Sequence, residues 1–150
     1  MALVHRAIEA PLDARRPRVE LLGLPRLVLH DAQPHVLERR DAALLALLVL
    51  QGPTSRHRVV GLLWPDLPLR AAQSNLRQRL FRLKQRVGSA IVVAEPAMML
   101  ADGIQHDLTP EIGTLAHLPD DAERPLLGSL EYDDCGELAE WVARARTLGR

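Results

Sequence analysis

The side chains of this sequence best suited to bind a ligand lie in one short basic stretch. RAAQSNLRQRLFRLKQRV, residues 70–87, contains six Lys or Arg and no acid, although the formal net charge of the 150-residue chain is zero. Guanidinium groups bind phosphates and guanine, and the amide of Gln pairs with the edge of a base. Basic amphipathic helices also bind membranes and acidic proteins, so composition alone leaves these partners open.

Few other residues offer chemistry. The six histidines have neither a His-x-x-x-His spacing nor a neighbouring pair of cysteines, which argues against a metal site. Cys135 is the one cysteine, and no Cys–His motif supports nucleophilic catalysis. Neither a phosphate-binding loop nor a dinucleotide fingerprint is present. We therefore expect a binding protein with no cofactor and no enzymatic activity.

Composition indicates a soluble protein with an ordinary core. The chain is 47% hydrophobic and 25% charged, and its longest apolar run, residues 42–50, is too short to cross a bilayer. The N-terminus lacks the apolar core and small-residue cleavage site of a secretion signal. With one cysteine no internal disulfide can form, which fits a reducing compartment. These features predict a cytoplasmic protein.

Apolar spacing places the basic stretch on a helix over residues 69–87 that ends at Gly88. One face is apolar and consists of Leu69, Ala72, Leu76, Leu80, Leu83 and Val87. The polar face and its edges supply the predicted DNA-binding residues of this helix, which are Arg70, Ser74, Arg77, Gln78, Phe81, Arg82, Gln85 and Arg86. Two alternatives are open for Phe81, which could contact a thymine methyl group or pack under a loop or against the C-terminal tail.

Two further helices precede the basic one. Asp41 is a suitable N-cap for a largely apolar helix that stops at Gly52, and Thr54 or Ser55 can cap a second helix that ends at Trp64. This second helix and the leader add basic residues that are predicted to contact the DNA backbone, namely Arg56 and Arg58, with Arg15 and Arg16 as further candidates.

Short strand signals flank the three helices. Residues 19–31 predict a hairpin, residues 35–40 a third strand, and residues 90–108 a strand, a turn and a strand. Strands, three helices and a final hairpin are the layout of a winged helix-turn-helix, in which the third helix enters the major groove. We therefore predict an α+β fold with a small antiparallel N-terminal sheet, three helices, a C-terminal β-hairpin wing and a short helical tail.

The tail differs from the basic helix in charge. Between residues 120 and 140 eight acids accompany one basic residue, so we expect this segment to face a protein and not DNA. Leu138, Trp141, Val142 and Ala145 form a helical stripe, which predicts that Trp141 anchors the tail either to the winged helix or to a further helical repeat. The predicted division is a flexible leader at 1–17, a DNA-binding domain at 18–109, and a linker with an incomplete helical segment at 110–150.

Residues 39–88 resemble the winged-helix DNA-binding domain of the Streptomyces antibiotic regulatory protein (SARP) family of bacterial transcription activators. The most specific pieces are Leu62-Leu63-Trp64-Pro65-Asp66, Asn75-Leu76-Arg77 and Arg82-Leu83, and the likeness extends over residues 19–109. That domain is similar in fold to the effector domain of two-component response regulators. The segment PLLGSLEYDDCGELAEWVARARTLGR is similar to the start of the bacterial transcriptional activator domain that follows it in this family.

The resemblance implies a sequence-specific DNA-binding regulator of transcription, an activator by family likeness, with the helix at 69–87 in the major groove. It further implies that two copies bind direct repeats of double-stranded DNA, which allows a homodimer, and that they contact RNA polymerase. Two alternatives stay open. The basic helix could dock on an acidic protein partner, or the chain could be a truncated antagonist that occupies operators without activating transcription.

Overall fold

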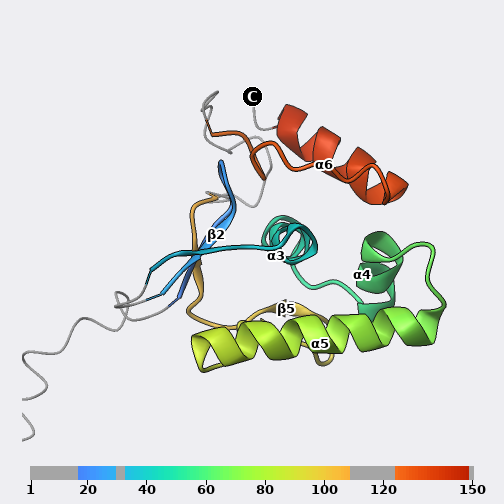
Figure 1. Ribbon diagram of the computed structural model, residues 1–150, viewed down its shortest axis with the longest axis horizontal. Helices are drawn as coiled ribbons and strands as arrows, with labels where there is room; N and C mark the ends of the chain where they lie inside the picture. Colours follow the sequence, from blue (N-terminus) through green and yellow to red (C-terminus); the bar gives the residue numbers. More distant parts are fainter. Residues whose placement is uncertain (1–16, 30–32, 109–123, 149–150) are drawn as a thin grey trace, which may run out of the picture.

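The computed structural model describes residues 17–29, 33–108 and 124–148, and these residues form a mixed α+β fold. Four helices and two small sheets are present in these ranges (Figure 1). The predicted leader lies outside the described residues except for Pro17, and so does the predicted domain boundary at residue 109. In chain order the elements are β1 (Arg18–Glu20), β2 (Arg26–Val28), β3 (His35–Val36), α3 (Arg39–Gln51), α4 (Arg56–Leu63), α5 (Leu69–Val87), β4 (Val92–Val93), β5 (Met99–Leu100), β6 (Gln105–His106) and α6 (Gly136–Leu148).

The first sheet has the strand order β3-β2-β1-β6. β1 pairs with β2 and β2 with β3 in antiparallel register, as predicted, but β6 lies parallel to β1. The antiparallel pairing of the N-terminal strands is therefore confirmed, whereas the parallel fourth strand was not predicted, because the chain returns to this sheet only after the hairpin β4–β5. Asp107 fixes the return, since its carboxylate accepts hydrogen bonds from the backbone N–H groups of Leu21 at 2.7 Å and Leu22 at 3.1 Å.

Helix α3 is the buried centre of the fold, and residues 41–48 are all buried. Its N-cap is Glu38 and not Asp41 as predicted. The Glu38 side chain accepts hydrogen bonds from the backbone N–H groups of Arg40 and Asp41, so the helix begins at Arg39 and carries Asp41 inside its first turn. The predicted end is confirmed, because Gly52 caps the helix with a φ of 78° that a side chain would strain.

The ends of the next two helices agree with the sequence. Ser55 caps α4 by accepting a hydrogen bond from the Arg58 N–H, and Trp64 follows its last residue. α5 begins after Pro68 and ends at Gly88, which is left-handed. Leu69 is 48% exposed although its spacing placed it on the apolar face. Helical side chains tilt toward the N-terminus, so the first one extends beyond the packed turns.

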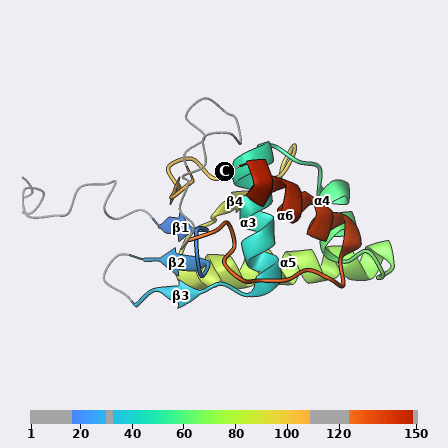
Figure 2. The ribbon, with the colours of Figure 1, turned by 90° about the horizontal axis from the view of Figure 1, so that it is seen from above.

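The C-terminal segment packs on the rest of the chain. α6 lies against α4, on the opposite side of α4 from α5 (Figures 1 and 2). Trp141 is buried and belongs to the same hydrophobic cluster as the residues of α3 and α4. Of the two predicted alternatives, it therefore anchors the tail to the preceding part of this chain. Gly128 approaches the β1–β2 turn so closely that a Cβ there would lie 2.8 Å from the Gly23 carbonyl oxygen.

Polar contacts join the same parts. The Tyr132 hydroxyl donates to the Arg39 carbonyl oxygen at 2.8 Å, and the Cys135 thiol donates to the Leu63 carbonyl oxygen at 3.3 Å. Burial raises the pKa of both the Tyr132 hydroxyl and the Cys135 thiol above their ordinary values. Cys135 is thus a buried neutral thiol in a structural role.

Candidate nucleic-acid interface

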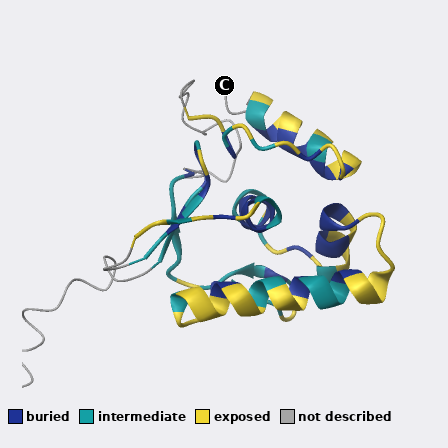
Figure 3. Cartoon of the chain, viewed as in Figure 1, coloured by how far each residue is buried: buried dark blue, intermediate teal, exposed yellow. Residues whose placement is uncertain are grey.

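Helix α5 has one buried and one exposed face along a length of about 28 Å. Ala72, Leu76 and Leu83 are buried toward the body of the protein. Figure 3 shows exposed residues along the whole length of α5, alternating with intermediate and buried ones, and the exposed residues form the surface opposite the buried face. We call this surface the α5 face. Its exposed members are Arg70, Arg77, Gln78, Phe81, Arg82, Lys84, Gln85 and Arg86, whereas Ser74 is only half exposed.

The positive charges of the α5 face have no acidic partners among the described residues. In the part of the chain that the structure describes, no carboxylate oxygen lies within 4 Å of Arg70, Arg77, Arg82, Lys84 or Arg86. Arg86 has one polar neighbour, since its Nη1 lies 3.5 Å from His35 Nδ1. Because no ion pair must be broken, these guanidinium groups can bind an external anion without losing an internal partner.

Arg79, the remaining basic residue of α5, faces the body of the protein. Its Nη1 lies 3.3 Å from Glu38 Oε2 and 3.8 Å from Asp41 Oδ2, both at the start of α3. Burial of the Asp41 carboxylate raises its pKa to about 6, and the charge of Arg79 opposes that shift. Sequence reasoning missed this contact because no spacing along one helix shows which residue of α5 meets the start of α3.

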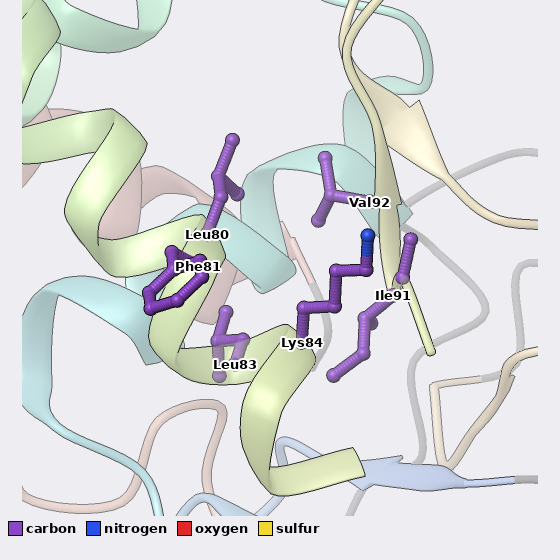
Figure 4. A pocket seen from close by; sticks show the side chains of 7 residues that line it. Leu80, Phe81, Leu83, Lys84, Ile91 and Val92 are labelled. Atoms are coloured by element: carbon purple, nitrogen blue, oxygen red, sulfur yellow. The ribbon is translucent and has the colours of Figure 1, made fainter. Parts of the chain in front are cut away.

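Phe81 is 59% exposed in the middle of the α5 face, so it does not pack inside the described fold. Beside it a hollow of about 240 Å³ separates α5 from β4. Figure 4 shows Lys84 extending from the helix toward Ile91 and Val92 across this hollow. No described loop and no described part of the tail covers Phe81, and the alternative of contact with a thymine methyl group stays a prediction.

The two α4 residues predicted to contact the DNA backbone, Arg56 and Arg58, form ion pairs away from the α5 face. Arg58 donates a hydrogen bond to the Glu137 carboxylate of α6, so its guanidinium is directed away from α5. Arg56 Nη2 lies 3.8 Å from Glu95 Oε1 in the β4–β5 turn. The further candidates, Arg15 and Arg16, lie outside the described residues.

Other kinds of site find no support in the described ranges. No three His, Cys, Asp or Glu side chains of residues 17–29, 33–108 and 124–148 are grouped as metal ligands would be. Within the same residues no helix is both long enough and apolar enough to span a bilayer. No protein-family model matches this chain, and no curated protein matches it. The resemblance to the SARP regulators therefore stays a prediction based on residues 19–109.

Proposed function

We propose that this protein is a winged-helix regulator of transcription that binds double-stranded DNA sequence-specifically through the α5 face. The observation behind the proposal is the α5 face itself, an exposed helical surface of Arg, Lys, Gln and Phe whose cations have no carboxylate partner within 4 Å among the described residues. The order of three strands, three helices and the hairpin β4–β5 supports it, because a winged helix has that order.

The dimensions of α5 suit the major groove, which is about 12 Å wide and admits one α-helix. Gln78 and Gln85 are seven residues apart on the exposed side, a rise of about 10.5 Å that corresponds to about three base pairs. In the proposed complex these two amides pair with base edges, and Phe81, between them, contacts a thymine methyl group. Phosphates or guanines are held by Arg70, Arg77, Arg82 and Arg86.

The C-terminal segment contributes differently. Its Asp134 side chain binds Arg39 and Arg40, and its Glu137 side chain binds Arg58. In the proposed complex α6 therefore packs on the side of α4 that faces away from α5, and it does not touch DNA. Binding to direct repeats as two copies, and contact with RNA polymerase, follow from the SARP resemblance and extend the proposal from DNA binding to activation.

Two experiments test the proposal. The preferred sequence is selected from a pool of random duplexes, and its affinity and that of a scrambled duplex are then measured over a range of salt concentrations. We expect a strong preference for one motif and a steep fall of affinity with salt, because bound phosphates release counterions. Arg77→Gln should reduce the salt slope by about 1, as the loss of one phosphate contact does. Arg144→Gln is the matched control, since Arg144 is exposed on α6, across α4 from the α5 face.

Equal and weak binding to both duplexes would overturn the proposal. The α5 face would then be an electrostatic surface for an acidic protein, which is one of the two alternatives left open by the sequence. An Arg144→Gln variant that lost as much salt dependence as Arg77→Gln would also contradict it, because binding would then follow total charge and not the α5 face.

A further inference from the structure

A cavity of about 390 Å³ lies beside α5 and shares Arg82 and Arg86 with the α5 face, but it extends away from Gln78 and Phe81 toward β3 and α3. It is partly open to solvent and is lined by β3, the start of α3 and the second half of α5, with Leu27, Leu37 and Leu83 as apolar walls. This volume falls in the range of cavities that hold small molecules. Its polar lining comes from two stretches that are far apart in the sequence, residues 35–41 and 79–86, and consists of His35, Glu38, Asp41, Arg79, Arg82 and Arg86.

The α3 side of the cavity has an excess of negative charge. Glu38 and Asp41 share the single guanidinium of Arg79, at 3.3 Å and 3.8 Å. Asp41 is only 8% exposed, and its Oδ1 has no hydrogen-bond partner among the described residues. Asp41 lines the cavity, and its carboxylate has hydrogen-bonding capacity that the described residues do not use, so a donor supplied by a ligand would be favourable at this carboxylate.

The α5 side of the cavity has an excess of positive charge. Neither Arg82 nor Arg86 lies within 4 Å of a carboxylate in the described part of the chain, and Arg86 is 3.5 Å from His35. Guanidinium groups match the geometry of a carboxylate, which can accept two parallel N–H bonds. The two sides therefore present opposite charges across one small cavity with apolar walls.

We propose that this cavity binds a small organic acid that also carries a hydroxyl or amino group. The acid group accepts hydrogen bonds from Arg82 and Arg86, and the second group donates to the Asp41 carboxylate. Because the proposed function assigns the same two arginines to DNA, such a ligand would compete with DNA for them. This last consequence rests on the proposed function, whereas ligand binding itself does not.

The test uses three probes of similar size. Propionate has no second polar group, lactate has a hydroxyl group and alanine has an amino group. Each is titrated into the ¹⁵N-labelled full chain, with sodium chloride at equal ionic strength as the control. We expect saturable shifts of the Arg82 and Arg86 Nε–Hε signals and of the backbone around His35, with tighter binding of lactate or alanine than of propionate. Shifts that sodium chloride reproduces would overturn the proposal.

Three variants locate the binding. Arg86→Gln should weaken lactate binding about tenfold, the loss expected for one charge-assisted hydrogen bond. Asp41→Leu, which removes both carboxylate oxygens, should abolish the preference for lactate over propionate. Arg77→Gln, which removes the same charge as Arg86→Gln but outside the cavity, should leave lactate binding unchanged. Equal losses in Arg86→Gln and Arg77→Gln would show a diffuse attraction to α5 and would refute the site.

The two proposals can fail separately. Localised lactate binding without sequence-specific DNA binding would contradict the proposed function and leave the cavity site standing. Specific DNA binding without localised shifts on addition of lactate would contradict the cavity site and leave the proposed function standing. If both hold, lactate or alanine at saturating concentration should weaken DNA binding by the native chain but not by the Arg86→Gln variant, and an unchanged affinity in the native chain would refute the competition.

Discussion

Replacing Asp41 by Asn should stabilise the protein relative to the native chain, and this stabilisation should be larger at neutral pH than at acidic pH. Asp41 lies in the first turn of α3, buried and only 3.8 Å from the guanidinium of Arg79. Burial disfavours its charged form more strongly than Arg79 favours it, so its pKa rises from 3.8 to about 6. Asn keeps the shape of the side chain and has no proton to lose.

The size of the effect follows from the pKa. The interval from 3.8 to about 6 corresponds to about 3 kcal/mol, since one pKa unit is worth about 1.4 kcal/mol. A carboxyl group whose pKa is higher in the folded state binds its proton more tightly there. Its contribution to stability is therefore complete below pH 3.8, falls as the pH rises to about 6, and stays constant above that value.

Urea denaturation from about pH 4 to about pH 8 measures this difference, because the free energy of unfolding is obtained at each pH. The advantage of Asp41→Asn over the native chain should grow by up to about 3 kcal/mol across this range and then level off. Other titrating groups are common to both proteins and cancel in the comparison. Asp133→Asn, at an exposed acid, is the control and should run parallel to the native chain.

Parallel curves for Asp41→Asn and the native chain would refute the reasoning, because they would show that the Asp41 carboxylate pays no penalty for burial. An advantage that shrinks as the pH rises would refute it more strongly. The ion pair with Arg79 would then outweigh desolvation, and the charged form would be the favoured one in the folded state.

Other substitutions test the core and the α5 face. Trp64→Ala should lower the free energy of unfolding by about 3–5 kcal/mol in urea, because the buried indole leaves a cavity, and a loss below about 1 kcal/mol would show that Trp64 is not a core residue. Phe81→Ser should leave the melting temperature nearly unchanged, since the ring is exposed, but alter the preferred sequence in duplex selection; a large drop in melting temperature would show internal packing. Arg82→Ala should cost about 1–3 kcal/mol of binding to the preferred duplex if Arg82 contacts a base, and an unchanged affinity would exclude it from the interface.

The sequence predicted best the features that depend on neighbouring residues. Ser55 caps α4, and Gly52 and Gly88 end α3 and α5, because capping and positive φ involve only the adjacent turn. The buried stripe of α5 was also predictable from its period, apart from Leu69 at the free first turn. Local signals were therefore sufficient to place the α5 face on one helix.

Contacts between distant segments could not be predicted in the same way. β6 joins β1 in parallel register through residues more than eighty positions apart. Glu38 displaced Asp41 as the cap because its side chain reaches the backbone N–H groups of Arg40 and Asp41, an uncommon use of glutamate at that position. Asp134 binds Arg39 and Arg40, more than ninety positions away, and these contacts hold the pKa of the carboxyl well below its usual range.

The neutral total charge conceals an unequal arrangement of charges. Two acids of the C-terminal segment bind basic residues of α3 and α4, Asp134 with Arg39 and Arg40 and Glu137 with Arg58. The cations of the α5 face keep no such partners within the described residues. At physiological salt, charges farther away than about 8 Å are largely screened, so a phosphate at the α5 face is attracted by the local arginines and little affected by acids beyond α4. A protein with zero net charge can therefore hold a polyanion at one surface, while its neutrality weakens the long-range attraction that would otherwise draw it to nucleic acids of any sequence.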